Sequence, residues 1–197
     1  MRARRIVLAS GSPRRRELLA TMGVTFDVIT SDVDETVELF DGPVDFALQV
    51  ARRKADAVAG RLTDALVIGG DTVVEVDGRI FGKPAGAAHA ARMLGELSGR
   101  AHRVVTAVAV VDTASGRRRA DAATSTVRMR DLGAAEIAAY IASGEPFDKA
   151  GAYAIQGLGS RLVAGYEGAL DTIIGLPTAT LRGLLAAFGV ALPAAPG

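Results

Sequence analysis

Residues 65–81 read ALVIGGDTVVEVDGRIF, and this stretch decides the fold class. Residues 65–68 are fully apolar, which is typical of a strand that is buried on both faces and ends at the following glycines. Residues 72–76 then alternate between polar and apolar, and Asp77-Gly78 predicts a tight turn into a further short strand. A buried strand followed at once by a hairpin indicates a mixed sheet rather than a purely parallel one.

Helical patterns lie on both sides of this stretch. Pro43 opens a helix in which apolar residues recur at helical spacing to Val58, and Pro177 opens the last helix. Two long strands joined near Gly116 are expected to be antiparallel because their connection is short. The expected strands are 5–9, 26–30, 104–111 and 124–129, and the other expected helices are 13–22, 87–97 and 134–142. Strands that alternate with helices, interrupted by hairpins, predict an α/β fold with a mixed sheet.

Length and composition limit the class of protein. The chain has 197 residues, 49% of them apolar and 23% charged, which predicts one globular domain over 1–197 with a frayed tail over 191–197. The densest apolar run, residues 104–111, is far shorter than the ~20 residues that span a bilayer. There is no cysteine, which excludes disulfides, thiolate metal sites and cysteine nucleophiles. A net charge of +1 gives no general reason to expect nucleic acid or an anionic membrane as a partner.

The first residues raise a question of targeting. Residues 1–16 carry six arginines and no acid, a composition that also occurs in organellar transit peptides. However, Ile6-Val7-Leu8-Ala9 is typical of a first strand, and a presequence would usually precede the fold. We therefore expect a cytoplasmic protein.

The turn Ser10-Gly11-Ser12-Pro13 between the first strand and the first helix is a candidate anion site. Ser12 is a good N-cap, and the free N–H groups of a helix N-terminus attract anions. Arg14 and Arg15 place positive charge in the first helical turn, where acids would stabilise the helix better. This unfavourable choice points to a bound anion such as phosphate. The alternative is that Ser12 is only a cap and that the arginines only add solubility.

Other candidates lie in the loops that follow strands. Asp71 follows the buried strand at the end where α/β proteins bind ligands, although such an acid can also merely satisfy turn backbone. Asp34 and Glu35 offer oxygen ligands for a divalent cation, or belong to a solvated acidic loop. Lys83 before Pro84 can bind phosphate, but taken alone it is more typical of a surface lysine.

A glycine-rich stretch over 144–159 contains Gln156, whose amide could contact the edge of a base, or it forms only a structured loop. The two histidines, His89 and His102, are too few and too isolated for a catalytic triad and are read as surface or strand residues.

Taken together, these segments resemble the Maf family of nucleoside triphosphate pyrophosphatases over about residues 6–188. The order and spacing of the motifs carry the resemblance, since no single motif is decisive. The motifs are Leu8-Ala9-Ser10-Gly11-Ser12-Pro13-Arg14-Arg15, Asp34-Glu35-Thr36, Ala51 to Ala55 around Lys54, Gly70-Asp71-Thr72-Val73-Val74, Gly82-Lys83-Pro84, Asp148-Lys149-Ala150-Gly151-Ala152-Tyr153, Ile155-Gln156-Gly157 and Gly175-Leu176-Pro177. Residues 168–171 match the family's usual sequence pattern less closely.

The resemblance implies an elongated mixed sheet flanked by helices, with a cleft between two lobes, as in Maf and ITPase-like folds. It implies hydrolysis of a nucleoside triphosphate to the monophosphate and pyrophosphate with a divalent metal, Mg²⁺ or Mn²⁺, and a homodimer as a common state. Arg14, Thr72 and Gln156 match the branch that prefers dTTP and UTP. Modified nucleotides are further possible substrates that the resemblance leaves open, and house-cleaning and cell-division arrest are the cellular roles that it leaves open.

Within this reading each candidate residue has a role. Asp71 is the expected proton acceptor, and Glu35 and Asp71 are the expected metal ligands. The residues expected to contact substrate are Ser10, Arg14, Arg15, Glu35, Lys54, Thr72, Lys83 and Gln156. Two alternatives remain at this point: a nucleotide-binding regulator without catalysis, and a nucleic-acid-binding module that uses the N-terminal arginines. Near-neutral charge and few aromatic residues argue against nucleic acid.

Overall fold

The computed structural model describes residues 4–193, so residues 1–3 and the last part of the expected frayed tail, 194–197, lie outside the described chain. The strands are β1 (Arg5–Leu8), β2 (Asp27–Val28), β3 (Ala65–Val76), β4 (Arg79–Phe81), β5 (Ala101–Asp112), β6 (Arg118–Met129) and β7 (Val163–Glu167). The α-helices are α1 (Pro13–Thr21), α2 (Gly42–Ala59), α3 (Ala87–Leu97), α4 (Ala134–Ala142), α5 (Leu170–Ile174) and α6 (Thr178–Ala187). Three short 3₁₀ helices are η1 (Glu145–Asp148), η2 (Ala150–Ala152) and η3 (Gly157–Leu162).

The strands form one mixed sheet in the order β2-β1-β3-β5-β6-β7, with β4 also paired to β3. β1 runs parallel to β2 and β3, whereas β4 is antiparallel to β3 and β7 is antiparallel to β6. In the β5–β6 hairpin, Asp112 N donates to Arg117 O and Met129 N donates to Arg100 O, each at 2.9 Å, which gives the same antiparallel register at both ends. The predicted α/β class with a mixed sheet is confirmed.

The chain divides into two compact units. The first unit contains the residues up to Asp71, Thr106–Ala123 and the residues from Gly175 onward. The second unit contains Thr72–Val105 and Thr124–Ile174. Strands β3, β5 and β6 each contribute residues to both units, and the expectation of a single domain over 1–197 stays a prediction.

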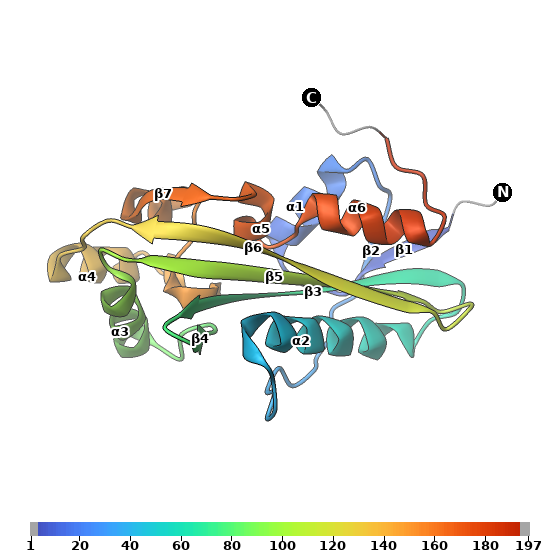
Figure 1. Cartoon of the computed structure of the whole chain (residues 1–197), viewed down its shortest axis with the longest axis horizontal. Helices are drawn as coiled ribbons and strands as arrows, with labels where there is room; N and C mark the ends of the chain where they lie inside the picture. Colours follow the sequence, from blue (N-terminus) through green and yellow to red (C-terminus); the bar gives the residue numbers. More distant parts are fainter. Residues whose placement is uncertain (1–3, 194–197) are drawn as a thin grey trace. The chain divides into compact units, whose positions relative to one another are not determined.

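In the first unit, α1 and α6 lie on one side of the strands and α2 lies on the other (Figure 1). Successive strand residues point to opposite faces, so the even-numbered residues of β3 face α1 and α6. The core on that side contains Ile6, Leu8, Leu19, Leu66, Ile68, Val108, Val110, Leu181 and Leu185. This core fixes β1 and α1 beside β3, where the candidate anion site lies.

The second unit has its own core beneath α3 and α4. It contains Val74, Val76, Leu94, Leu97, Val104, Val127, Met129, Tyr140 and Tyr153. The predicted β3–β4 turn is present, with Asp77 at φ 52° and Gly78 at φ 77°, which is the geometry that the Asp-Gly pair favours. The core holds the glycine-rich segment over 144–159 against the sheet through Tyr153.

Several predicted elements are confirmed, whereas β7, α5 and the three 3₁₀ helices were missed and β6 begins at Arg118 rather than at 124. Helices α3 and α4 have the predicted ends, and α2 and α6 begin within a residue of the predicted prolines. β7 and α5 were not predicted, because glycines interrupt the pattern at Gly165 and Gly168. No helix in the described part of the chain is long and apolar enough to cross a membrane.

Candidate active site

The turn between β1 and α1 is built around two serines. Ser12 is the N-cap of α1, and its Oγ accepts a bond from the backbone N–H of Arg15 at 3.4 Å. Ser10 is buried, and its Oγ accepts from the backbone N–H of Ser12 at 3.2 Å. Pro13 begins the helix. The turn therefore has the local structure that the sequence predicts for an anion site at a helix N-terminus.

The side chain of Arg15 is held in one orientation across this turn. Its Nε donates to the Gly175 carbonyl at 2.8 Å, and its Nη1 lies 3.3 Å from Ser10 Oγ. The sequence analysis missed the Gly175 carbonyl, because a backbone acceptor 160 residues away has no local sequence signal. These two bonds fix the guanidinium beside the N-terminus of α1.

The sequence analysis expected Asp71 to follow the end of its strand. In the structure Asp71 instead lies within β3. The parallel ladder between β1 and β3 ends at the pair Leu8–Ile68, whereas β3 itself continues to Val76, because β4 pairs with its last three residues and β5 also pairs with β3. The predicted strand end was therefore wrong, and the role of Asp71 stays a prediction. Asp71 lies three residues beyond the last β1 partner, where the parallel part of the sheet stops.

Lys54 joins the two predicted carboxylates. Its Nζ donates to Asp71 Oδ1 at 2.8 Å and lies 2.9 Å from Glu35 Oε1. Lys54 and Asp71 are both buried, whereas half of the Glu35 side chain is exposed. The three residues come from α2, β3 and the acidic loop, so three separate segments meet at one ammonium group.

Two glycines make this meeting possible. A Cβ on Gly69 would lie 2.3 Å from the Ala51 carbonyl and 2.9 Å from Ala55 Cβ, so only glycine lets α2 approach β3 this closely. Lys54 lies between these two alanines and therefore reaches Asp71. A Cβ on Gly70 would lie 3.3 Å from Arg15 Nε, which places the guanidinium of Arg15 directly against β3.

The electrostatics of the cluster depend on burial. Burial raises the pKa of Asp71 above its usual value, although the cations of Lys54 and Arg15 oppose the rise. Burial likewise lowers the pKa of the Arg15 guanidinium, against the effect of Asp71 and Glu35. A buried carboxyl group with a raised pKa beside two cations is typical of functional sites.

The donor set fits a divalent cation that also binds substrate. Glu35 and Asp71 approach the same ammonium group, so their carboxylates lie near each other. Mg²⁺ commonly takes one or two carboxylates together with substrate phosphates and water. Within residues 4–193 no group of three histidine or acidic side chains forms a ready-made protein metal site. The neighbouring Asp34 instead accepts from the backbone N–H of Thr36 at 2.9 Å, as in a loop turn.

The cluster contains five of the predicted residues: Ser10, Arg15, Glu35, Lys54 and Asp71. Arg14 lies in the first turn of α1 and affects the pKa of Arg15 through its charge. The remaining three belong to the second unit. Thr72 follows Asp71 in β3, Lys83 is exposed after β4, and Gln156 is exposed just before η3.

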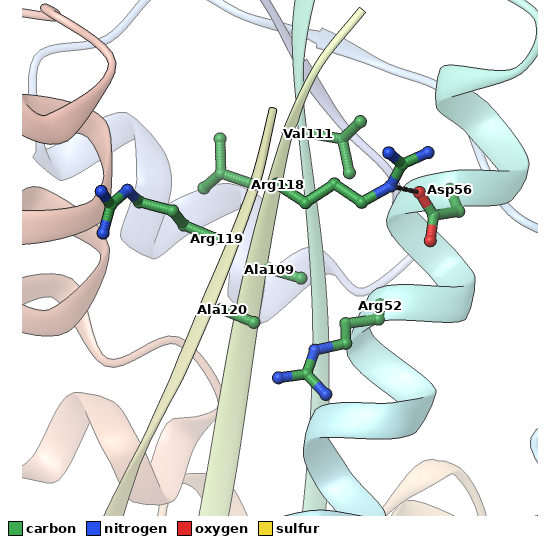
Figure 2. A pocket seen from close by; sticks show the side chains of 8 residues that line it. Arg52, Asp56, Ala109, Val111, Arg118, Arg119 and Ala120 are labelled. Atoms are coloured by element: carbon green, nitrogen blue, oxygen red, sulfur yellow. Dashed lines mark hydrogen bonds and ion pairs between the residues drawn. The ribbon is translucent and has the colours of Figure 1, made fainter. Parts of the chain in front are cut away.

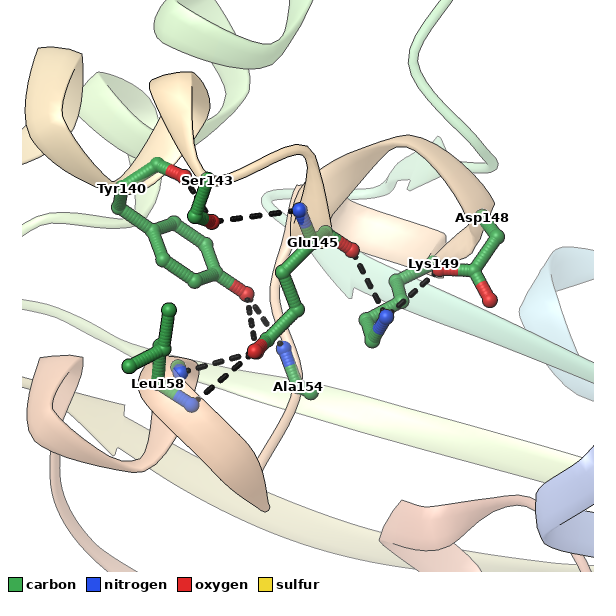
Figure 3. Close-up of polar contacts among 8 residues, drawn as sticks. Tyr140, Ser143, Glu145, Asp148, Lys149, Ala154 and Leu158 are labelled. Carbon is green, nitrogen blue, oxygen red and sulfur yellow. Dashed lines mark hydrogen bonds and ion pairs between the residues drawn. The ribbon is translucent and has the colours of Figure 1, made fainter.

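Glu145 organises the segment that carries Gln156 (Figure 3). Its carboxylate accepts from the backbone N–H groups of Leu158 and Gly159 and from the hydroxyl of Tyr140, all at 3.0 Å. The Tyr140 hydroxyl also accepts from Ala154 N at 3.3 Å. The backbone is thus held on both sides of residue 156.

Lys149 fixes Glu145 from its other side, because Lys149 Nζ donates to the Glu145 carbonyl at 2.7 Å and to Asp148 Oδ1 at 2.6 Å. The sequence analysis did not identify Glu145 or Tyr140. The glycine-rich stretch was the available signal, since a Cβ on Gly157 would lie 2.8 Å from Glu145 Oε2.

A separate pocket lies where α2 faces β5 and β6 (Figure 2). Its floor is small and apolar, with Ala109, Val111 and Ala120, and Arg52 lies at its edge. Arg118 Nε donates to Asp56 Oδ1 at 2.8 Å, which ties the start of β6 to α2. The pocket contains none of the predicted site residues.

Comparisons with known proteins identify the family of the chain. The family described as "Maf-like protein" matches residues 5–188. A protein of Moorella thermoacetica named dTTP/UTP pyrophosphatase is 51% identical over 94% of this chain and 96% of its own length. A protein of Bacillus cereus with the same name is 44% identical over 95% and 97%.

Among solved structures, the Ham1 protein of Staphylococcus aureus has a TM-score of 0.53 at 18% identity, over 93% of this chain and 97% of that chain. A HAM1 protein from Coxiella burnetii has a TM-score of 0.50 at 16% identity, over 96% of this chain and 100% of that chain. These two likenesses concern the fold. The family match and the close relatives extend over nearly the whole chain, and the chain therefore belongs to the Maf-like protein family.

Proposed function

We propose that this chain is a nucleoside triphosphate pyrophosphatase that hydrolyses dTTP and UTP to the monophosphate and pyrophosphate. The observation that carries the proposal is the buried Lys54–Asp71 pair, with Glu35 on the same ammonium group and Arg15 fixed nearby. A cluster of two cations and two carboxylates suits a substrate that is both highly anionic and bound with a metal. The activity named for the close relatives supports the same reaction.

The phosphates are proposed to bind at the start of α1. Arg15 offers a guanidinium charge that Ser10 and Gly175 hold in place, and Arg14 adds charge in the same helical turn. The Ser10 hydroxyl and the Lys54 ammonium add further donors to phosphate oxygens. Lys83 is proposed as a point charge for the leaving pyrophosphate.

Asp71 is proposed as the general base. It accepts a proton from a water molecule whose oxygen attacks the α-phosphorus, and the bond from that phosphorus to the bridging oxygen breaks. Burial raises the pKa of Asp71, which makes it a stronger base than an exposed carboxylate. Lys54 keeps the deprotonated form accessible, because its positive charge opposes that rise.

Glu35 and Asp71 are the residues proposed to hold Mg²⁺ or Mn²⁺. When bound, such a cation neutralises phosphate charge and makes the α-phosphorus more electrophilic.

Gln156 is proposed to select the base. A pyrimidine presents either O4 or an amino group at its edge, and a fixed amide can pair with only one of them. Thr72 and Arg14 are proposed to complete this selection. A homodimeric state, a cytoplasmic location and a role in removing unwanted nucleotides also stay predictions.

A panel of nucleoside triphosphates tests the proposal. Pyrophosphate release is measured for dTTP, UTP, CTP, dCTP, ATP and GTP, with Mg²⁺, with Mn²⁺ and with chelator. We expect dTTP and UTP to have the highest kcat/KM, and we expect Gln156→Ala to flatten this preference more than it lowers the best rate. Binding of triphosphates without any pyrophosphate release would instead favour a non-catalytic regulator.

Asp71→Asn tests the role of the base, since it keeps the shape and removes the charge. A positioned base contributes ~10²–10⁴-fold, so kcat should fall by about that factor while the circular dichroism spectrum is unchanged. Asp34→Asn is the matched control, because Asp34 bonds only within its own exposed turn among the interactions described above. If Asp71→Asn kept about half of the activity, the assignment of the base would be wrong.

A further inference from the structure

The pocket between α2 and the strands β5 and β6 is distinct from the candidate active site (Figure 2). All the residues that line it belong to the first compact unit, and none of them is a predicted site residue. It holds about 400 Å³ of space and is open to solvent. Sites for small molecules commonly have volumes of ~300–1,000 Å³, so the pocket can take a ligand of modest size.

The floor of the pocket is apolar and narrow. Ala109 and Val111 of β5 are buried at its bottom, and Ala120 of β6 is half-buried. The register of the β5–β6 hairpin places Ala120 directly opposite Ala109, so their methyl groups lie next to each other. The side chains of this floor offer no hydrogen bond to a ligand. A flat apolar group therefore fits it better than a bulky or polar one.

Arg118 closes one end of the pocket in a fixed orientation. Its Nε donates to Asp56 Oδ1 at 2.8 Å, and its Nη1 donates to the Gly116 carbonyl at 2.9 Å. These two bonds restrict the side chain before a ligand arrives, which lowers the entropy that binding must overcome. A planar guanidinium held in this way can stack on a flat ring or attract an anion.

Arg52 lies at the other end of the pocket. Figure 2 shows its guanidinium extended from α2 toward the strands, with Ala109 and Ala120 between it and Arg118. Arg52 and Asp56 are four residues apart and share one face of α2, yet Asp56 pairs with Arg118 instead. The charge of Arg52 acts on Asp45, but within residues 4–193 its side chain forms no hydrogen bond or ion pair. Its donors are therefore available to a ligand.

Asp56 adds an acceptor to the same face of α2. Its Oδ1 accepts from Arg118, and its Oδ2 has no partner in the described part of the chain. A carboxylate with an open oxygen can accept hydrogen bonds from the hydroxyls of a ribose. Arg52 lies about 6 Å away along the helix axis, a separation that a single sugar and its phosphate can span.

We propose that this pocket is a second nucleotide site, which binds a ribonucleoside 5′-monophosphate. The phosphate accepts from the open donors of Arg52, the ribose hydroxyls donate to Asp56, and the base lies on the alanine floor beside Arg118. Asp56 offsets one of the two guanidinium groups that point into the pocket, so the charge balance favours one phosphate group over three. The inference rests on this pocket alone and does not depend on the proposed activity.

The apolar floor also predicts how the pocket treats different bases. Because only methyl groups of Ala109, Val111 and Ala120 face the base, its polar edge finds no matched partner there. The pocket is therefore expected to accept purines and pyrimidines alike. This behaviour differs from the pyrimidine preference that we propose for the candidate active site, so the two sites can be told apart by their ligands.

An NMR titration of the full chain separates the two sites by residue. The backbone amides of Ala109, Val111 and Ala120 report this pocket, and those of Ser12 and Gly70 report the candidate active site. UMP and AMP should saturate the pocket with dissociation constants within about threefold of each other. Uridine and inorganic phosphate should each bind at least about tenfold more weakly, because each lacks part of the contacts. Deoxy-UMP should also bind about tenfold more weakly, because it lacks the 2′-hydroxyl.

Variants at the two ends of the pocket test the assigned contacts. Arg52→Ala should raise the dissociation constant for UMP in the pocket about tenfold, because a charge-assisted bond to phosphate is lost. Asp56→Ala should remove the preference for UMP over deoxy-UMP. Arg119→Ala is the matched control: it removes the same charge next to Arg118, but Figure 2 shows its side chain directed away from Asp56, so the constant should stay within about twofold.

Three results would overturn the proposal. The first is a titration in which UMP causes no saturable shift at the pocket residues. The second is equal binding of UMP and uridine there, and the third is an equal loss of affinity in Arg52→Ala and Arg119→Ala, which would indicate attraction by general positive charge only. Each of these results can be read whether or not the chain hydrolyses dTTP and UTP, because the titration needs no turnover.

Discussion

The ammonium group of Lys54 donates to the carboxylate of Asp71 at 2.8 Å, and both side chains are buried. The pair joins α2 to β3 and holds the charge of Asp71 in an environment whose burial disfavours it. Glu35, on the same ammonium group, acts in the opposite sense, because its negative charge raises the pKa of Asp71. The two neighbours therefore tune one carboxyl group in opposite directions.

This relationship predicts opposite shifts of the pH–rate profile. If Asp71 is the base, the acidic limb of kcat/KM follows its pKa in the free enzyme. Lys54→Gln removes a charge that lowers this pKa, so the limb should move to higher pH. Glu35→Gln removes a charge that raises it, so the limb should move to lower pH. Profiles measured at saturating metal check both, and shifts of the same sign in the two variants would exclude Asp71 as the titrating group.

Gly69 is predicted to be required for the site as well as for the fold. Gly69→Ala brings a Cβ to 2.3 Å from the Ala51 carbonyl, so α2 must move away from β3 and Lys54 must move with it. Overpacking of this kind costs about 1–3 kcal/mol, and we expect activity to fall further than stability alone explains. Urea unfolding together with kcat of the folded variant measures the two effects.

Gly95→Ala is the control for that substitution. Gly95 lies inside α3, and nothing lies within 4 Å of an added Cβ. The same change should stabilise the chain by up to about 1 kcal/mol through helix propensity and leave kcat unchanged. A Gly69→Ala variant as stable and active as Gly95→Ala would show that α2 does not need this close approach.

Much of the fold could be predicted from local patterns. The Asp77-Gly78 turn and the prolines before α2 and α6 each carry their own backbone preference, so they mark elements without knowledge of the tertiary structure. The continuity of β3 through Gly69 and Gly70 could not be predicted in this way. Those glycines are typical of a strand end, and only the partners β4 and β5 extend the ladder past them.

In the candidate site, too, some features could be predicted from the local sequence and others could not. Ser12 could be identified as a cap because capping is local, whereas the bond from Arg15 to the Gly175 carbonyl depends on how distant segments pack. Glu145 shows the same limit, since its partners at 158 and 159 are backbone N–H groups that leave no mark on the sequence. Residue type thus predicts which charged residues belong to the candidate site, whereas the contacts that orient their side chains depend on the tertiary structure.

His102 predicts a pH dependence of stability. It is buried in β5, with Nε2 2.7 Å from the Tyr153 hydroxyl, and its buried Nδ1 has no hydrogen-bond partner among the described residues. Burial lowers the pKa of His102 from 6.5 to about 4, so the folded chain keeps the ring neutral where the unfolded chain protonates it. The free energy of unfolding should therefore fall as the pH drops from 6.5 to 4.

The size of this effect follows from the shift in pKa. At about 1.4 kcal/mol per pKa unit, His102 should account for a loss of about 3 kcal/mol between these pH values. Urea unfolding of the parent and of His102→Gln over pH 4–7.5 isolates this contribution, since only the parent should show it. Parallel stability curves for the two proteins would mean that the ring also protonates in the folded state.

Glu145 is predicted to act as a positioning residue for Gln156. Burial raises its pKa, but the bonds from Gly159, Leu158 and Tyr140 outweigh this effect and leave the pKa below its usual value. These bonds need an acceptor on both oxygens, and Glu145→Gln turns one oxygen into an amide donor facing a backbone N–H. The loop should loosen on both sides of Gln156 while the Gln156 side chain itself is unchanged.

The measurement is the ratio of kcat/KM for UTP to that for CTP, because a loss of stability alone would lower both values together. We expect this ratio to fall about tenfold in Glu145→Gln, since a base-selective pocket depends on polar groups held in place. Asp148→Asn is the matched control: it removes one charge from the same 3₁₀ helix but leaves the carboxylate of Glu145 intact, so the ratio should stay at the parent value. If the parent itself shows no preference for UTP, the proposed specificity fails. If the parent shows the preference and Glu145→Gln keeps it in full, Glu145 is not needed to position Gln156.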